Sequence, residues 1–111
     1  MTIHDAHEQA LIDLRELTER MLELARRAEW TAVEEARPIR ETLLRAAFAQ
    51  PISPELAPRA AVEIRRTLAA EQALTDLALA ERERAARDLR DLRGARRGVG
   101  HYQDVIRDST A

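Results

Sequence analysis

Near the N-terminus, three side chains have the chemistry of a metal-binding set. His4, His7 and Glu8 fall within one helical turn, and imidazole and carboxylate groups are ordinary ligands of zinc. A solvated helix start accounts for the same residues without any metal, and this is the interpretation that we favour. We therefore predict no metal site and no bound cofactor.

The residue types that the chain lacks exclude several other chemistries. It has no Cys, which excludes disulfides, thiol nucleophiles and cysteine-ligated zinc. It has no Lys either, so a lysine Schiff base and a lysine general base are also excluded. Polar Glu71, Thr75 and Arg82 interrupt the apolar stripe of a long predicted helix, but no nucleophile or base lies near them in the sequence. We predict that the chain is not an enzyme.

Basic side chains gather in one stretch of the sequence. The most basic stretch of the chain contains Arg84, Arg87, Arg90, Arg93, Arg96 and Arg97. Acidic Glu83, Asp88 and Asp91 are interleaved with them, so we expect a solvated helix face with ion pairs; an acidic protein partner is the alternative. With 18 basic against 20 acidic residues, the net charge of −2 argues against direct binding of nucleic acid.

The composition of the chain predicts an all-α fold. The 111 residues fit one domain, and aromatic residues make up only 3%, so Leu and Ala must supply most of the core. Leu and Ala are among the strongest helix formers, whereas strands favour β-branched and aromatic residues. We predict an antiparallel three- to four-helix bundle with a long third helix and a short C-terminal segment.

Apolar spacing and capping signals set the predicted bounds of the first two helices. Apolar residues at alternating steps of four and three predict a helix over residues 5–28. Thr31 and Glu34 have capping-box spacing, which predicts a second helix over 31–49 with Trp30 as a hydrophobic staple before its cap. Pro38 lies inside that stretch and predicts a kink or two short helices.

The third helix is predicted over residues 55–93, where Gly94 supplies a stop. Residues 1–93 then form the bundle, and residues 94–111 form a flexible C-terminal segment with room for a short fourth helix. At 1.5 Å per residue the first helix is about 36 Å long, and the uninterrupted part of the third, residues 59–93, is about 52 Å long. The end of the third helix therefore has apolar side chains without a bundle partner, and such a surface marks an interaction site.

The N-terminus has no basic and apolar leader, and no apolar run approaches the length of a membrane span. We therefore expect a cytoplasmic protein without membrane insertion.

Several segments in this order resemble the flagellar export chaperone FliT family. They are residues 22–30 (LELARRAEW), Arg40 followed by Leu43 and Leu44, and residues 64–74 (IRRTLAAEQAL). Tyr102 falls where family members carry a C-terminal tyrosine, so the resemblance extends from Leu14 to Tyr102. It implies a chaperone that holds the C-terminal segment of the filament-cap (hook-associated) protein until export. It also implies contacts with the export ATPase apparatus or with the flagellar transcription activator complex.

An amphipathic client segment would lie in an apolar groove that the overhang of the third helix offers. We expect this client to contact Ile64, Leu68, Glu71, Leu74, Leu77 and Ala78. The resemblance further implies that the C-terminal helix covers the client site, so Tyr102, Val105 and Ile106 are the expected anchors of a regulatory tail.

Two alternatives stay open. A homodimeric coiled-coil adaptor is one, although the stripe of the third helix is too interrupted for a long heptad seam. An enzyme that resembles chorismate mutase is the other, on the faint likeness of Leu14-Arg15-Glu16-Leu17 to that family's first helix. Such a site needs several buried cations, with Lys commonly among them, which disfavours the enzyme.

Overall fold

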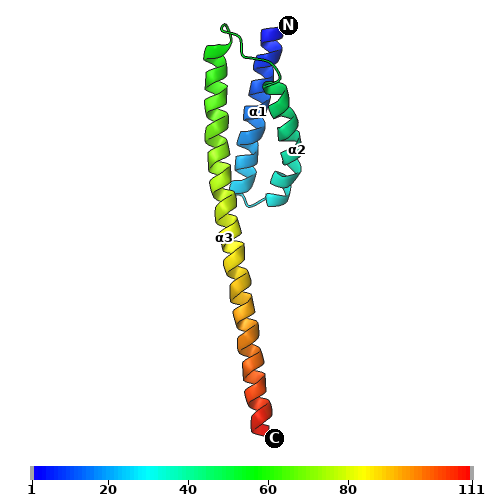
Figure 1. Cartoon of the computed structure of the whole chain (residues 1–111), viewed down its shortest axis with the longest axis vertical. Coiled ribbons are helices and arrows are strands. Elements are labelled where there is room, and N and C mark those ends of the chain that lie inside the picture. Colours follow the sequence, from blue (N-terminus) through cyan, green and yellow to red (C-terminus); the bar gives the residue numbers. More distant parts are fainter. Residues whose placement is uncertain (1, 111) are drawn as a thin grey trace. The chain divides into compact units, whose positions relative to one another are not determined.

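The computed structural model describes residues 2–110, with side chains for residue 2 and residues 4–107. The chain forms three helices, α1 (Ile3–Arg26), α2 (Trp30–Ala47) and α3 (Ala57–Thr110), and this described part contains no strand (Figure 1). The prediction of an all-α fold with a long third helix is therefore confirmed. None of these helices is long and apolar enough to cross a membrane in the region described.

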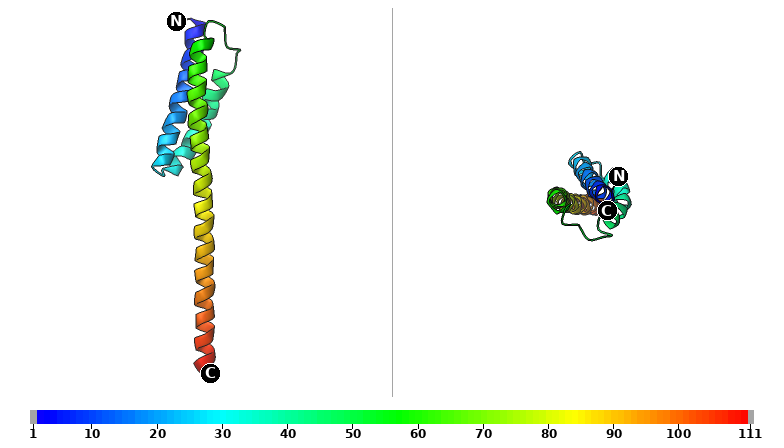
Figure 2. Two further views of the ribbon diagram at one scale, coloured as in Figure 1. Left: turned by 90° about the vertical axis from the view of Figure 1, so that its left-hand side faces the viewer. Right: turned by 90° about the horizontal axis from the view of Figure 1, so that it is seen from above.

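The chain divides into two compact units, Met1–Ala78 and Leu79–Ala111. In the first unit, α1, α2 and the start of α3 pack together, and α2 runs antiparallel to the other two (Figures 1 and 2). The second unit consists of the remainder of α3.

Helix α1 begins at a capping box. The Thr2 hydroxyl accepts a hydrogen bond from the Asp5 amide at 3.2 Å, and the Asp5 carboxylate accepts one from the Thr2 amide at 3.0 Å. These hydrogen bonds lower the pKa of Asp5, because they favour its charged form. The cap places the helix start at Ile3, two residues before the predicted start.

Helix α1 ends in a Schellman motif, which explains why the predicted start of the second helix was wrong. The Glu29 amide donates to the Leu24 carbonyl and the Ala28 amide to the Ala25 carbonyl, both at 2.9 Å. Ala28 has φ of 59°, the left-handed conformation that glycine usually supplies at this position. Because the chain reverses here, α2 begins at Trp30 with Glu29 as its N-cap, and Thr31 is not the cap.

Helix α2 continues through Pro38 as a single helix rather than two short ones. Proline removes one backbone hydrogen bond, but its fixed φ is compatible with a helix. Buried Val33 and Ala47 lie on opposite sides of Pro38 along the helix and pack into the core. Tertiary packing therefore holds α2 in place on both sides of the proline.

Three side chains at the start of α1 contact the end of α2, the connector and the start of α3. The Nε2 of His7 lies 2.7 Å from the Ala47 carbonyl, which can only accept, so this nitrogen carries the proton. The Nδ1 of His4 lies 2.9 Å from the Ser53 hydroxyl, and Glu8 forms an ion pair with Arg59 at 2.7 Å. The three side chains that resembled a metal set thus each have a separate partner within the bundle.

Two apolar clusters form the core of the first unit. One joins Met21, Leu22 and Ala25 of α1 to Val33 of α2 and to Ala70 and Leu74 of α3. The other contains Leu11, Leu14, Ala47, Leu56 and Ala60. Thr18 is fully buried in α1, and its hydroxyl donates to the Leu14 carbonyl at 2.7 Å. Helix α1 therefore supplies about half of the buried core side chains, and the other two helices pack against it.

Helix α3 does not end at Arg93, and this part of the prediction was wrong. It continues through Gly94, Gly98 and Gly100, none of which has a positive φ. A glycine inside a helix costs about 1 kcal/mol relative to alanine, but it ends the helix only where the chain turns left-handed. Here the neighbouring residues are good helix formers such as Arg and Ala, and the local sequence has no proline.

Replacing Ala28 by glycine should stabilise the bundle. The left-handed conformation costs an L-residue roughly 1 kcal/mol and glycine almost nothing, so Ala28→Gly should raise the free energy of unfolding by about 1 kcal/mol. Urea unfolding followed by circular dichroism measures this change. The matched control is Ala69→Gly at an exposed position within α3, which should lower stability by a similar amount. Destabilisation by both substitutions would contradict the role assigned to Ala28.

Candidate protein-binding groove

An apolar groove lies between α2 and α3, with α1 as its floor. Leu11 and Leu14 of α1 form the base, and both side chains are almost fully buried. The walls are formed by Arg40, Leu44, Phe48, Ile64, Thr67, Leu68 and Glu71. Both Figure 1 and the view from above in Figure 2 show α2 and the start of α3 on either side of α1. The groove lies wholly within the first compact unit.

The rim of this groove is apolar and exposed. Leu68 of α3 is 63% exposed and Phe48 at the end of α2 is 49% exposed, while Leu44 is exposed beside them. Phe48 is the only Phe of the chain. Large apolar side chains that gather around a groove usually mark a surface for another polypeptide. The groove therefore has the character of a binding site for an amphipathic segment.

One ion pair joins the two walls. Arg40 Nη2 of α2 lies 2.6 Å from Glu71 Oε2 of α3, and the Arg40 side chain is mostly buried. The contact lacks hydrogen-bond alignment, because Glu71 Oε2 and the buried Arg40 Nε have no hydrogen-bond partner among the described residues. A buried donor without a partner costs roughly 1–3 kcal/mol. Arg40 Nε is thus a buried donor that the groove leaves unsatisfied.

The structure brings together only some of the predicted site residues. Ile64, Leu68 and Glu71 all line the groove. Leu74 belongs to the buried core, Leu77 packs against that core, and Ala78 is half-buried outside the groove lining. In the second unit, Tyr102, Val105 and Ile106 all have exposed side chains.

The α2 wall of the groove was missed by the sequence analysis. Leu43 and Leu44 are neighbours, so they cannot both face the core of one helix, and the structure packs Leu43 inward and leaves Leu44 exposed. The lone Phe48 at the end of a helix was the other available signal. Without the rotation of α2 about its own axis, neither residue could be assigned to a groove.

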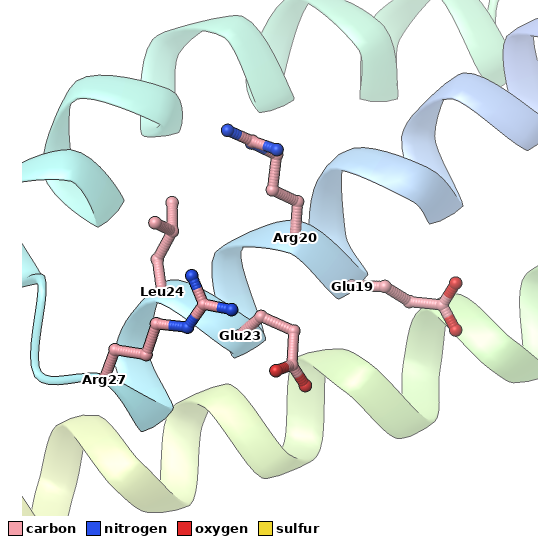
Figure 3. A pocket seen from close by; sticks show the side chains of 5 residues that line it. All are labelled: Glu19, Arg20, Glu23, Leu24 and Arg27. Carbon is pink, nitrogen blue, oxygen red and sulfur yellow. The ribbon is translucent and has the colours of Figure 1, made fainter.

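A second depression, on α1, is charged instead of apolar. It is lined by Glu19, Arg20, Glu23, Leu24 and Arg27. Figure 3 shows Glu19 and Glu23 extending toward α3, whereas Arg20 and Leu24 extend toward α2. Its acidic side is part of the structural contact between helices, so we do not regard it as the binding site.

A network of four charged side chains forms part of the contact between α1 and α3. Arg15 Nε lies 2.6 Å from Glu63 Oε2, and Arg15 Nη1 lies 3.0 Å from Glu19 Oε1. Arg66 Nη2 of α3 also reaches Glu19 Oε1 at 2.9 Å. Burial alone would raise the pKa of Glu19, but the hydrogen bonds from Arg15 and Arg66 outweigh it and lower this pKa. The hydrogen bond with Glu63 raises the pKa of Arg15.

A family model described as Flagellar protein FliT matches residues 8–104 of the chain. The chain belongs to the FliT family. No curated protein and no solved structure matches it. FliT-family membership implies the role of a flagellar export chaperone, which is not an enzyme, so the alternative that resembled chorismate mutase is excluded. The groove between α2 and α3 is thus an open apolar surface of a FliT-family chain.

The Glu19 network should make stability depend on pH in a defined direction. Because the folded pKa of Glu19 lies below its ordinary value of 4.5, its contribution is present above that value and is lost as the pH falls through the folded pKa. Glu19 is about one-third exposed, so we expect Glu19→Gln to cost only ~0.5 kcal/mol at pH 7. The variant should then lose less stability than the wild type between pH 5 and pH 3 in thermal unfolding. Glu23→Gln, on the same face, is the control, and equal flattening of both profiles would contradict the assignment.

Proposed function

We propose that this chain is a cytoplasmic flagellar export chaperone that holds the C-terminal segment of the filament-cap protein in the groove between α2 and α3. The observation that carries the proposal is the exposed apolar rim of Leu44, Phe48 and Leu68 above a buried leucine floor. Family membership supports the chaperone role itself. The shape and chemistry of the groove support an amphipathic helical segment as the part of the client that binds.

Binding would follow the helix-in-groove mode. Apolar client residues at helical spacing insert between Leu44 and Leu68, and their partners at the base are Leu11 and Leu14. Burial of one large apolar side chain contributes roughly 1.5–3 kcal/mol, and only a few such side chains fit this groove. A complex of about micromolar strength corresponds to ~8 kcal/mol. Such a complex is firm enough to protect the client and weak enough to release it at export.

The Arg40–Glu71 pair would orient the client. A carbonyl or carboxylate of the client can accept a hydrogen bond from Arg40 Nε, the buried donor without a partner, only after the Arg40 side chain turns outward. Glu71 lies opposite at 2.6 Å and limits how far a second acidic group can approach. The pair therefore supplies a polar reference point in an otherwise apolar site.

The six predicted client contacts differ in whether the client can reach them in this structure. Ile64, Leu68 and Glu71 can meet the client directly, because they line the groove. Leu74, Leu77 and Ala78 are packed in or beside the core, so contact with the client there requires the helices to rearrange. The resemblance also implies contacts with the export ATPase apparatus or the flagellar transcription activator complex, which we retain as secondary partners.

Tyr102, Val105 and Ile106 would act as anchors of a regulatory tail that competes with the client for the groove. All three side chains are exposed and apolar, as a displaceable cover requires. Each helical glycine at 94, 98 and 100 weakens this part of α3 by about 1 kcal/mol relative to alanine. Local unwinding there is therefore less costly than elsewhere in the helix.

Replacing Leu68 by aspartate should weaken client binding at least tenfold, which corresponds to about 1.4 kcal/mol. Leu68 is 63% exposed, so the charge costs little in the free protein but is buried without a partner in the complex. Isothermal titration calorimetry with the C-terminal segment of the filament-cap protein measures the change. Val62→Asp is the matched control, since Val62 is 46% exposed on α3 and does not line the groove. Equal affinity of Leu68→Asp and the wild type, with unchanged circular dichroism, would remove this groove from the client site.

Weakening the tail anchors should strengthen client binding. In the double variant Tyr102→Ser/Ile106→Ser, the tail competes less well, so the apparent affinity for the same client segment should rise several-fold. Sedimentation velocity on both proteins checks that the oligomeric state is unchanged, which separates this effect from loss of a homodimer. An unaltered affinity would contradict a covering role for these residues.

A further inference from the structure

Residues 82–99 of α3 carry an exposed surface that the client groove does not use. Two rows of side chains with seven-residue spacing lie side by side on this helix. One row contains Ala85, Leu92 and Val99, and the other contains Arg82, Leu89 and Arg96. We call these two rows the C-terminal stripe. Leu92 is 60% exposed, and Leu89 and Val99 are also exposed, so this amphipathic face has no partner in the described structure.

The arginines of this segment are not engaged in the ion pairs that the sequence led us to expect. Among the described residues the only ion pair here joins Arg84 to Glu81 at 2.8 Å. No carboxylate lies within 4.0 Å of Arg82, Arg87, Arg90, Arg93, Arg96 or Arg97 in the part of the chain that the structure describes. Arg84 and Arg87 precede Asp88 and Asp91 by four residues, and this order is the less favourable one for helical pairs.

We propose that the C-terminal stripe docks an acidic amphipathic helix of another protein. Residues 82–99 contain seven arginines against three acidic residues, which leaves a net charge of +4. The apolar row offers a seam for leucines, while Arg82 and Arg96 stand within the stripe, where a facing Glu or Asp would satisfy them. Arg93 borders the same face and adds a third cation. Shape and charge together thus fit a helix that is apolar on one face and acidic along its seam.

A second copy of this chain fits the stripe poorly. Parallel self-pairing would set Arg82 against Arg82 and Arg96 against Arg96 across the seam, and like charges there are repulsive. Antiparallel pairing would bury the same arginines against Ala85 or Val99 without an acceptor, which is also costly. A helix with acidic residues at those positions removes both penalties.

An anionic membrane surface fits less well than a protein helix. Helices that lie on membranes keep an unbroken apolar face, whereas two arginines interrupt this stripe. Asp88 also borders the stripe and would be repelled by anionic lipid headgroups. A protein helix can place a basic residue opposite Asp88, which a uniform anionic surface cannot do.

Two synthetic helical peptides test the proposal with the full-length chain. In the first, one row reads Glu-Leu-Glu at seven-residue spacing to complement Arg82, Leu89 and Arg96, and the neighbouring row is Leu throughout. The second peptide has Lys in place of both Glu residues. Fluorescence anisotropy of the labelled peptides should show at least tenfold tighter binding of the Glu peptide, with an affinity that falls as salt is added.

Reversing the charge of Arg82 and Arg96 tests whether these two arginines bind the acidic residues of the peptide. Arg82→Glu/Arg96→Glu should lose at least tenfold in affinity for the Glu peptide and should come to prefer the Lys peptide. The control Arg87→Glu/Arg90→Glu makes the same change in net charge on the opposite face of the helix, and it should keep its affinity within about threefold. Leu68→Asp in the groove should also bind the Glu peptide normally, which separates this site from the client site.

Four results would overturn the proposal. Equal losses in the stripe variant and its control would show that only net charge matters. If the Glu peptide does not bind the full-length chain, an acidic amphipathic helix is not the partner of the C-terminal stripe. Binding of phosphatidylglycerol vesicles that is lost in the stripe variant would assign the surface to a membrane. A wild-type dimer in sedimentation equilibrium that dissociates in the same variant would assign it to self-association.

Discussion

The first compact unit depends on one helix that packs against two others. Helix α1 buries Leu11, Leu14, Thr18, Met21, Leu22 and Ala25. Helix α2 buries only Val33 and Ala47, and their partners are mainly residues of α1. Val33 of α2 shares one core cluster with Ala70 and Leu74 of α3, and Ala47 shares the other with Ala60, so α2 and α3 also pack against each other beside the groove. The groove is therefore a consequence of how the core is distributed among the helices.

Charged side chains reinforce the same arrangement, and arginine suits this task. Arg15 reaches Glu19 and Glu63 at once, which the forked guanidinium allows and a lysine ammonium does less well. Arg66 and Arg59 add further pairs between α3 and α1. In residues 82–99 no neighbouring helix supplies carboxylates, and Arg84, which pairs with Glu81 of its own helix, is the only arginine there with an ion pair in the described structure. Arginine thus holds helices together in the first unit and forms an exposed charged surface in the second.

The sequence predicted the helices well where tertiary packing and local pattern agree. The spacing of apolar residues in α1 gave its extent to within two residues at each end, because that helix contacts neighbours along its whole length. The errors fell where a local signal competed with packing or with helix propagation. Thr31 has a capping pattern, but the Schellman motif at Ala28 fixes the start of α2 one residue earlier. Gly94 resembles a helix stop, yet nothing in the structure turns the chain there, and the helix continues.

For the candidate site, the sequence identified one wall and missed the other. The stripe of α3 could be followed by periodicity, so Ile64, Leu68 and Glu71 were found, but periodicity cannot show at which residue a stripe leaves the core. Leu74 and Leu77 continue the same pattern and are packed inward because α1 and α2 still cover that part of α3. The α2 wall depends on the rotation of a helix with two adjacent leucines, which is a tertiary property.

An open groove between well-packed helices implies a compromise between stability and binding. A larger apolar residue in place of Thr67, in the wall of the groove, would fill part of it and add buried surface, but it would occupy the space that a client needs. Thr67 instead donates its hydroxyl to the Glu63 carbonyl at 2.8 Å, so its polar group is satisfied within its own helix. Because this hydrogen bond satisfies the hydroxyl as a donor, Thr67 requires no polar acceptor from a bound segment. The groove thereby keeps the space that a larger side chain would fill, and this part of its wall suits apolar groups of a client.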